Sequence, residues 1–223
     1  MRLVNYKHNL NVKFDENTVN TIVIENKHTM SNIIFELIKQ MEGEDGEFVL
    51  STENKILDIN KYLDIVIDPF NINFNSKKII NSLYHELNET ALVLDEEKRK
   101  INEAIICSLD RIIFNEIYTG INHNLDFQWS DIFKLYNVSF SLEHISLLEK
   151  LIEYIKIQST FLKTKVLVFI NLKSYLTTND LIELYRQAAY NKIHLLLIDN
   201  CESIKINNEE ITLIDKDNCI IVK

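Results

Sequence analysis

Two apolar runs near the C-terminal end constrain the fold more than any other feature of this chain. Residues 166–170 and 193–198 are almost entirely aliphatic or aromatic, which is typical of strands covered on both faces. Between them, from Thr177 or Thr178 onward, apolar residues recur at helical spacing. A strand, a helix and a second strand in this order predict a βαβ unit with parallel strands.

The rest of the chain divides around a helical middle. Short β-branched or aliphatic runs before residue 68 predict strands at 21–24, 48–50 and 65–67 around a helix at 31–41. Apolar stripes predict helices at 76–92, 96–118 and 141–161, with a short helical stretch at 130–137. We therefore expect an α/β head, residues 1–76 and 163–223, interrupted by a helical leg, residues 77–162. The long stripes must be buried against each other or against a partner.

The scarcity of glycine limits nucleotide chemistry. The chain has three glycines, Gly43, Gly46 and Gly120, and one proline, so neither G-x-x-x-x-G-K-[ST] nor G-x-G-x-x-G occurs. Polar residues do follow the predicted parallel strands, with Asn171 after one and Asp199-Asn200 after the other, where α/β sheets bind ligands. These residues indicate either a vestigial nucleotide site or ordinary turn polarity.

The charge distribution bears on nucleic-acid binding. With 24 Lys and Arg against 33 Asp and Glu, the formal net charge is −9, which excludes a uniformly basic surface but not a local basic patch. Basic residues gather at Lys77-Lys78, at 98–100, at Lys163 with Lys165, and at Lys134. Each cluster could be a solvated helix face. Several on one surface could instead track phosphates, and oligomerisation could align them into a channel.

Metal sites and membrane segments have weaker support. Three cysteines without a C-x-x-C pair, and six scattered histidines, do not predict a zinc site. We expect Cys107 and Cys219 to be buried thiols of a reducing cytosol. No apolar run approaches the length of a membrane span. Residues 122–126 form either a surface loop or an oxygen-rich calcium site.

The C-terminal half also resembles a known family. The apolar run 166–170 ends in Asn171, then Tyr175-Leu176-Thr177 and Asp180 follow. Lysines precede that run, and 132–138 reads Ile-Phe-Lys-Leu-Tyr-Asn-Val. On these residues the chain resembles the small CRISPR-associated DNA-binding protein of subtype II-A systems, the fourth protein of those operons. The resemblance spans nearly the whole chain and is most specific over 130–200.

The resemblance implies a P-loop-NTPase-like α/β head without a Walker A site, interrupted by a helical leg. It implies a homotetrameric ring whose lumen lysines bind the ends of double-stranded DNA without sequence preference and without cutting. Such a protein acts in spacer acquisition, in the cytoplasm, beside the CRISPR integrase pair and the effector nuclease. Calcium ions hold the legs in the DNA-binding arrangement, and no nucleotide is required.

The resemblance assigns Lys134 to the lumen. Clustering and the pattern before the first apolar run add further DNA-binding candidates, which are Lys98, Arg99, Lys100, Lys163 and Lys165. The segment 115–131 corresponds to a strongly acidic stretch of the family and carries fewer acids here. Its candidate calcium ligands are Glu116, Asn122, Asn124 and Asp126.

Two other classes of function stay open. A metal-dependent nuclease or NTPase of the same pathway would need carboxylates beside a lysine, as in Glu96/Lys98 or Glu25/Lys27. A protein-interaction module without DNA affinity would use the long helices alone, and the acidic net charge suits it.

Overall fold

The computed structural model describes residues 1–53, 55–114, 120–141, 143 and 146–222. The chain forms two compact units. We call residues 1–73 and 142–223 the head and residues 74–141 the leg. The structure therefore assigns 142–162 to the head, whereas the sequence pattern placed these residues in the leg.

The head is built on a six-stranded sheet with the order β10-β9-β3-β8-β7-β6. Its strands are β3 (Val19–Ile24), β6 (Leu63–Val66), β7 (Val166–Ile170), β8 (His194–Asp199), β9 (Glu209–Ile214) and β10 (Ile220–Val222). All neighbours pair in parallel except β10, which runs antiparallel to β9. The α/β class and the predicted βαβ unit, β7-α7-β8, are confirmed.

A second, antiparallel sheet of the head has the order β2-β1-β4-β5. Its strands are β1 (Arg2–Asn5), β2 (Leu10–Lys13), β4 (Phe48–Thr52) and β5 (Lys55–Leu57). Only β4 was expected from the sequence. The other three hold three or four residues each, too few for alternation to stand out. The single turn α2 (Ile59–Tyr62) follows β5.

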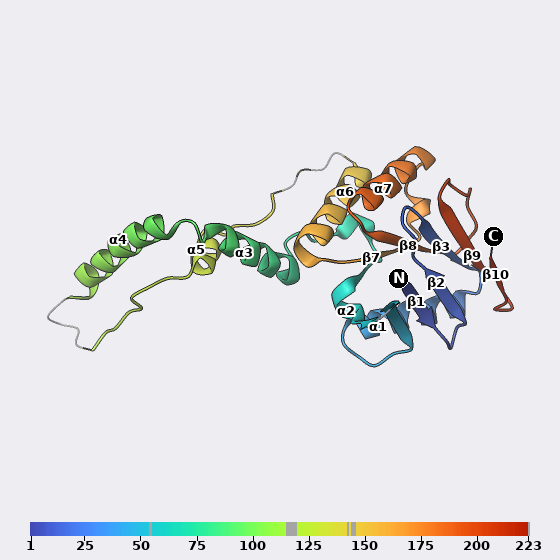
Figure 1. The fold of residues 1–223 in the computed structure, drawn as a ribbon, viewed down its shortest axis with the longest axis horizontal. Helices are drawn as coiled ribbons and strands as arrows, with labels where there is room; N and C mark the ends of the chain where they lie inside the picture. The colour runs from blue at the N-terminus through green and yellow to red at the C-terminus, as the bar shows by residue number, and fades with distance from the viewer. Residues whose placement is uncertain (54, 115–119, 142, 144–145, 223) are drawn as a thin grey trace. The chain divides into compact units, whose positions relative to one another are not determined.

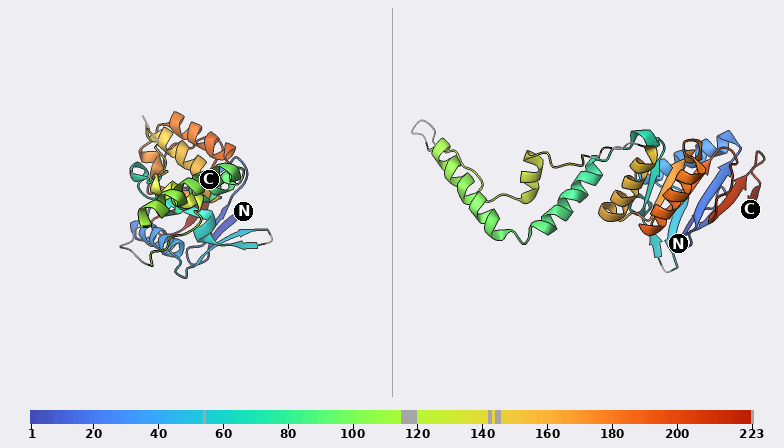
Figure 2. Two further views of the ribbon diagram at one scale, coloured as in Figure 1. Left: turned by 90° about the vertical axis from the view of Figure 1, so that its left-hand side faces the viewer. Right: turned by 90° about the horizontal axis from the view of Figure 1, so that it is seen from above.

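Helices and the small sheet cover the two faces of the large sheet. Helix α1 (Lys27–Met41) and the small sheet lie on one face, and α6 (Leu147–Ile157) and α7 (Thr178–Tyr190) lie side by side on the other (Figures 1 and 2). Strand β7 shows why its sequence is continuously apolar. Val166, Val168 and Ile170 join the core that α1 and the small sheet complete, while Leu167 and Phe169 point to the opposite face and are also fully buried.

Burial and a polar network fix α6 to the head. Leu151 and Ile155 are completely buried. The Tyr154 hydroxyl and the Gln158 amide both donate to the Asp64 carboxylate on β6. The π-helical turn η2 (Gln158–Leu162) then leads into β7. The apolar stripe of α6 therefore packs in the head.

The leg contains α3 (Lys77–Ala91), α4 (Asp95–Ile113) and α5 (Trp129–Leu135). Helix α3 buries Ile79, Leu83, Tyr84 and Ala91, but α4 has no buried residue. The predicted apolar stripe of α4 is present, but no described residue of this chain covers it. The short turns η1 (Pro69–Asn71) and η3 (Leu172–Ser174) belong to the head.

The structure tests two expectations from the sequence, on the burial of the cysteine thiols and on membrane-spanning segments. The thiols of Cys107 and Cys219 are exposed, as is that of Cys201, so the expectation of buried thiols was wrong. Cys107 lies on α4, which has no buried residue. Among the described helices, none is long and apolar enough to cross a membrane.

Replacing Ile155 by alanine tests the assignment of α6 to the head. Ile155 has no exposed surface, so Ile155→Ala should lower the free energy of unfolding by about 2–5 kcal/mol, through lost burial and a residual cavity. Chemical denaturation followed by circular dichroism measures this change. Ile204→Ala is the matched control, because Ile204 lies in the head and is 78% exposed. Equal effects of the two substitutions would contradict the packing of α6.

Candidate nucleic-acid interface

Aromatic packing holds α5 against α3 in the leg. The Tyr84 ring lies 5.6 Å from that of Phe133, centroid to centroid, and Trp129 stacks on Phe133 at 6.3 Å. The Tyr84 hydroxyl also donates to the Phe133 carbonyl over 3.3 Å. Phe127 meets Trp129 edge to face at 5.5 Å. These contacts position α5, and with it Lys134, on a defined support.

Lys98 is an anchor of the leg. Its ammonium lies 3.0 Å from Asp126 Oδ2 and 5.5 Å from the centroid of the Phe127 ring, and its side chain is only 24% exposed. One turn further along α4, the Asn102 amide donates to the Leu125 carbonyl over 2.8 Å. Lys98 and Asn102 together hold residues 125–127 against α4. Sequence clustering did not predict this role, since the partners are more than 20 residues away.

The other leg candidates are exposed on α4 and α5. Lys100 pairs with Glu96 at 2.8 Å, and Lys134 pairs with Asp131 at 3.5 Å. Arg99 is exposed, and no ion pair of the described residues involves it. Exposed pairs of this kind are worth at most about 1 kcal/mol. A phosphate can therefore replace either carboxylate at little cost.

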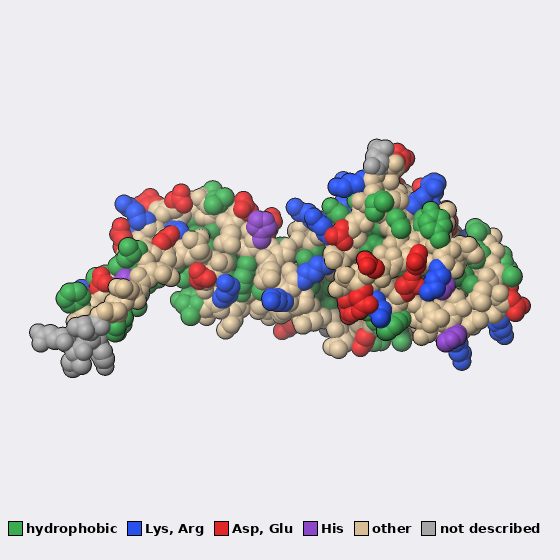
Figure 3. Space-filling model, turned by 90° about the horizontal axis from the view of Figure 1, so that it is seen from below, with side chains coloured by type: hydrophobic (Ala, Val, Ile, Leu, Met, Phe, Trp, Pro, Cys, Tyr) green, Lys and Arg blue, Asp and Glu red, His purple; other side chains and the backbone are tan. Residues whose placement is uncertain are grey.

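The two remaining DNA-binding candidates lie in the head. Lys163 ends the turn η2 in the left-handed conformation (φ 57°), and Lys165 directly precedes β7. Both are exposed, and neither takes part in an ion pair between described residues. The six candidates are thus divided, four in the leg and two in the head. On the face drawn in Figure 3, Lys and Arg side chains are interspersed with Asp and Glu in both units.

The calcium candidates make contacts that compete with a metal. Asp126 is engaged by Lys98. His123 lies between Asn124, whose carbonyl is 2.9 Å from its Nδ1, and Asp110, whose Oδ1 is 3.0 Å from its Nε2. These two hydrogen bonds raise the pKa of His123. Asn122 and Asn124 offer neutral amides, and Glu116 lies outside the described residues. Among the described residues, no three His, Cys, Asp or Glu gather in a group that could hold a metal ion, so calcium binding here stays a prediction.

At the carboxyl edge of the large sheet, the structure brings together the polar residues expected there. Asn171 adopts φ 52° after β7, and its Oδ1 accepts the Asn200 backbone N–H over 3.1 Å. In nucleotide-binding α/β folds this edge faces the ligand. The hydrogen bond ties the end of β7 to the end of β8, so the two asparagines stabilise the edge itself.

The start of α1, the other place where such folds hold phosphate, is capped by the chain. Asn26 Oδ1 accepts the backbone N–H groups of His28 and Thr29, at 3.0 and 3.3 Å. The turn after β9 covers this end. Asn26 Nδ2 donates to the Lys216 carbonyl over 3.0 Å, and Thr29 Oγ1 lies 2.6 Å from Asn218 Oδ1. The N–H groups of His28 and Thr29, which could face an anion, are thus used within the protein.

A buried polar cluster lies between the large sheet and α7. Lys173, whose side chain is 5% exposed, pairs with the fully buried Glu209, which also accepts from Thr21 and from the Ile206 N–H. Both carboxylate oxygens of Asp199 are buried, and neither has a hydrogen-bond partner among the described residues. Burial raises the pKa of Asp199 to about 6, against the opposing charge of Lys173. Of this cluster, the sequence analysis named only Asp199, as a polar residue that follows a predicted strand.

Comparison with known proteins decides the family. The model of the CRISPR-associated protein family Csn2 matches residues 40–218. The chain belongs to the Csn2 family. CRISPR-associated protein Csn2 of Enterococcus faecalis is 21% identical over 183 residues, 80% of this chain and 81% of the relative. The crystal structure of Stu0660 of Streptococcus thermophilus superposes with a TM-score of 0.63 at 13% identity, over all of this chain and 76% of that one. That likeness supports the fold.

In this Csn2-family chain, the C-terminal pattern that suggested the family has a local structural role. Thr177 Oγ1 accepts the Asp180 N–H over 3.3 Å, and Asp180 Oδ2 accepts the Thr177 N–H over 3.0 Å. The two residues form a capping box that begins α7. This part of the pattern therefore fixes where α7 begins in the head.

The Asp199 carboxylate predicts a pH-dependent stability. Its folded pKa of about 6 exceeds the value of 3.8 for a free group, so ionisation opposes folding, and the penalty grows as the pH rises through this window. Asp199→Asn should raise the free energy of unfolding by about 1–3 kcal/mol near pH 8 and by less near pH 4. Denaturation at both pH values measures the effect. Asp45→Asn, in an exposed turn, should show no such difference. A loss of stability near pH 8 would contradict the burial of an ionised Asp199.

Proposed function

We propose that this Csn2-family protein is a ring-forming homotetramer that binds the ends of double-stranded DNA during CRISPR adaptation, without cutting the DNA. The observation that carries the proposal is the family match, which extends over residues 40–218 and so includes the entire leg. The CRISPR integrase pair and the effector nuclease are its proposed partners in spacer acquisition.

The charges of the leg support binding to the DNA backbone. Arg99, Lys100 and Lys134 present exposed cations, whose only described partners are exposed carboxylates. Contacts of this kind neutralise phosphates without reading bases. The net charge of −9 repels DNA from the rest of the surface. Binding is thus confined to places where the cations of several subunits meet.

The apolar stripe of α4 supports assembly. Ile101, Ile105 and Ile112 are 40%, 38% and 73% exposed, on a helix of 19 residues with no buried side chain. An isolated helix gains most of its stability from packing one face. In a closed symmetric oligomer, the leg of a second subunit covers the apolar stripe of α4. The same symmetry places the cations of each leg around a common axis.

The edges of the head support a role without nucleotide chemistry. Asn26 accepts the first N–H groups of α1, and the turn 215–218 covers them. The asparagines after β7 and β8 bond to each other. Calcium is not required by the proposal, because Asp126 is paired with Lys98 and the exposed cations of the leg need no metal to meet phosphate.

The decisive experiment compares linear with covalently closed circular DNA of the same length in gel shifts over a salt series. We expect stable binding to the linear duplex that falls steeply as salt rises, and little retention on circles, which have no ends to thread. Lys134→Glu should weaken binding to the linear duplex by about tenfold or more, since every subunit loses a phosphate contact and gains a like charge.

Lys7→Glu is the matched control for that variant. Lys7 is 63% exposed and lies 3.6 Å from Glu36, while Lys134 is 65% exposed and lies 3.5 Å from Asp131. The two substitutions change the charge equally, but Lys7 belongs to the head. Equal binding to both DNA forms, or equal effects of the two variants, would overturn the assignment of DNA binding to the leg.

Placing a charge on the α4 stripe tests the assembly. Ile105→Glu puts a carboxylate among apolar side chains that a second copy would cover, so the mass measured by light scattering should fall toward the 26.3 kDa of one chain. Cys107→Glu adds the same charge two residues further along, on the opposite side of the helix, and should leave the mass unchanged. Unchanged mass in Ile105→Glu would remove α4 from the interface.

A further inference from the structure

Four lysines lie along the amino edge of the large sheet, where β6, β7 and β8 begin. Lys61 is in the last turn of α2, which leads into β6. Lys163 and Lys165 precede β7, and Lys192 precedes β8. All four are exposed, and none forms an ion pair with a described residue, the exposed Asp58 at the start of α2 included. We call these four the edge lysines.

Backbone hydrogen bonds place the edge lysines in one row. The Lys165 N–H donates to the Tyr62 carbonyl over 2.8 Å, and the His194 N–H donates to the Lys165 carbonyl over 2.9 Å. The three chain segments therefore enter the sheet in register. Neighbouring strands lie about 4.8 Å apart, so the row extends for about 10 Å across three strands.

Two of the edge lysines have an uncommon backbone conformation. Lys163 ends η2 with φ 57°, and Lys192 follows α7 with φ 56°, at helix ends where glycine is usual. The two turns touch, since the Ser159 hydroxyl donates to the Asn191 carbonyl over 2.8 Å. The other described residues with positive φ, glycine aside, are all asparagine, which tolerates this conformation well. Lysine at these two turns therefore adds charge that the backbone conformation does not require.

Positive charge prevails at this edge in spite of a nearby acid. Glu16 lines a depression of about 310 Å³ together with Lys192 and His194. The pKa of His194 is nevertheless lowered, first by burial and then by the positive charges of the Met1 amino group and Lys165, and Glu16 opposes this shift less strongly. The field at the start of β8 is therefore that of the cations.

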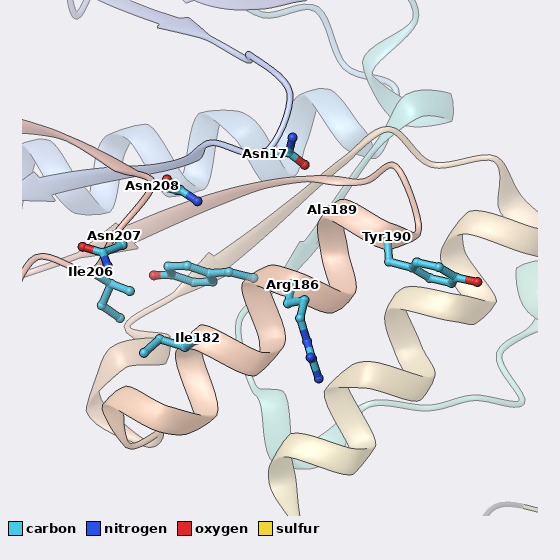
Figure 4. Close-up of a pocket in the computed structure, with 9 residues that line it drawn as sticks. Asn17, Ile182, Arg186, Ala189, Tyr190, Ile206, Asn207 and Asn208 are labelled. Carbon is cyan, nitrogen blue, oxygen red and sulfur yellow. The ribbon is translucent and has the colours of Figure 1, made fainter.

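The neighbouring cavity beside α7 does not extend this row of charge. Its volume is about 480 Å³, and Figure 4 shows Arg186 and Tyr190 on one side of it and Asn207 and Asn208 on the other. Arg186 is paired with Glu183, and the amides carry no charge. The unpaired cations of this region are thus those of the amino edge.

We propose that the amino edge of the head binds the phosphate backbone of one strand of a DNA duplex, in addition to the cations of the leg. A DNA strand carries one phosphate per about 3.4 Å of helix axis, so a row about 10 Å long faces about three phosphates. A small anion would meet only part of the row. Such contacts position the duplex without reading its bases. This inference rests on the proposed DNA binding and adds the head to it.

Acetylation of lysines in the full-length protein, followed by peptide mass spectrometry, reports on each lysine separately. With a saturating linear duplex, we expect acetylation of the edge lysines to slow by about threefold or more, because phosphates cover them. Lys27 and Lys216 are internal references, since both are exposed and lie at the carboxyl edge, around the start of α1. Their acetylation should not change.

The same measurement separates this inference from the proposed function. Protection of Lys134 on the leg without protection of the edge lysines would overturn the inference and leave the proposed function standing. Protection of the edge lysines without Lys134 would support the inference and remove the leg contact. Protection of the edge lysines in concentrated protein without DNA, lost on dilution, would assign this edge to an acidic surface of a second copy and overturn the proposal.

A double variant tests the charges without disturbing the backbone. Lys163→Asn with Lys192→Asn removes two cations and introduces the residue that this chain already uses at positive φ. In gel shifts, affinity for the linear duplex should fall by about tenfold or more, and the slope of log K against log salt should fall by about two for each subunit in contact. Lys27→Asn with Lys216→Asn is the matched control, because it changes the net charge equally at the opposite edge.

Stability measurements distinguish binding from a purely structural role. Lysines at helix ends also interact favourably with the negative end of the helix dipole. If that is their role here, the double variant is less stable in chemical denaturation and keeps its affinity for DNA, and this result would overturn the proposal. We expect unchanged or higher stability together with weaker binding. Equal losses of affinity in the double variant and its control would also overturn the proposal.

Discussion

Burial of both faces of the parallel sheet is the constraint on which the rest of the head depends. Successive side chains of β7 point to opposite faces of the sheet, and both sets are buried. None of the residues of β7 is more than 7% exposed. A strand of this kind is stable only when a layer covers each face. Helix α1 and the small sheet supply one layer, and α6 and α7 supply the other. This requirement explains why α6 belongs to the head, although it follows the leg in the chain.

The leg follows a different principle. Helix α3 and α5 share an aromatic contact through Tyr84 and Phe133, but α4 has no core of its own. Its charges are balanced locally, by Asp126 for Lys98 and by Glu96 for Lys100. A surface with exposed aliphatic side chains beside weakly paired cations suits assembly with further copies and contact with phosphate. In our proposal both properties serve one function, because the ring that covers the stripe also gathers the cations.

Sequence reasoning located some site residues and misjudged the roles of others. Asn171 and Asn200 were expected at the carboxyl edge, and they do meet there. Lys98 was grouped with Arg99 and Lys100 by adjacency, yet it lies between Asp126 and Phe127. The difference arises because neighbours on a helix point about 100° apart, so only tertiary contacts show which of them meets a partner. Glu209 carried no sequence signal, and the buried ion pair with Lys173 appears only in the folded structure.

The sequence by itself determined the α/β class, the βαβ unit and the helical insertion, because periodicity follows directly from which faces of a strand or helix are apolar. It also excluded glycine-rich phosphate loops by composition alone. The tertiary structure decided where α6 packs, that the start of α1 is closed by Asn26, and that Asp199 is buried beside Lys173 and Glu209. These features depend on contacts between residues far apart in the chain, and no local pattern records such contacts. The row of lysines at the amino edge belongs to the same class, since it joins residues 61, 163, 165 and 192 across three strands.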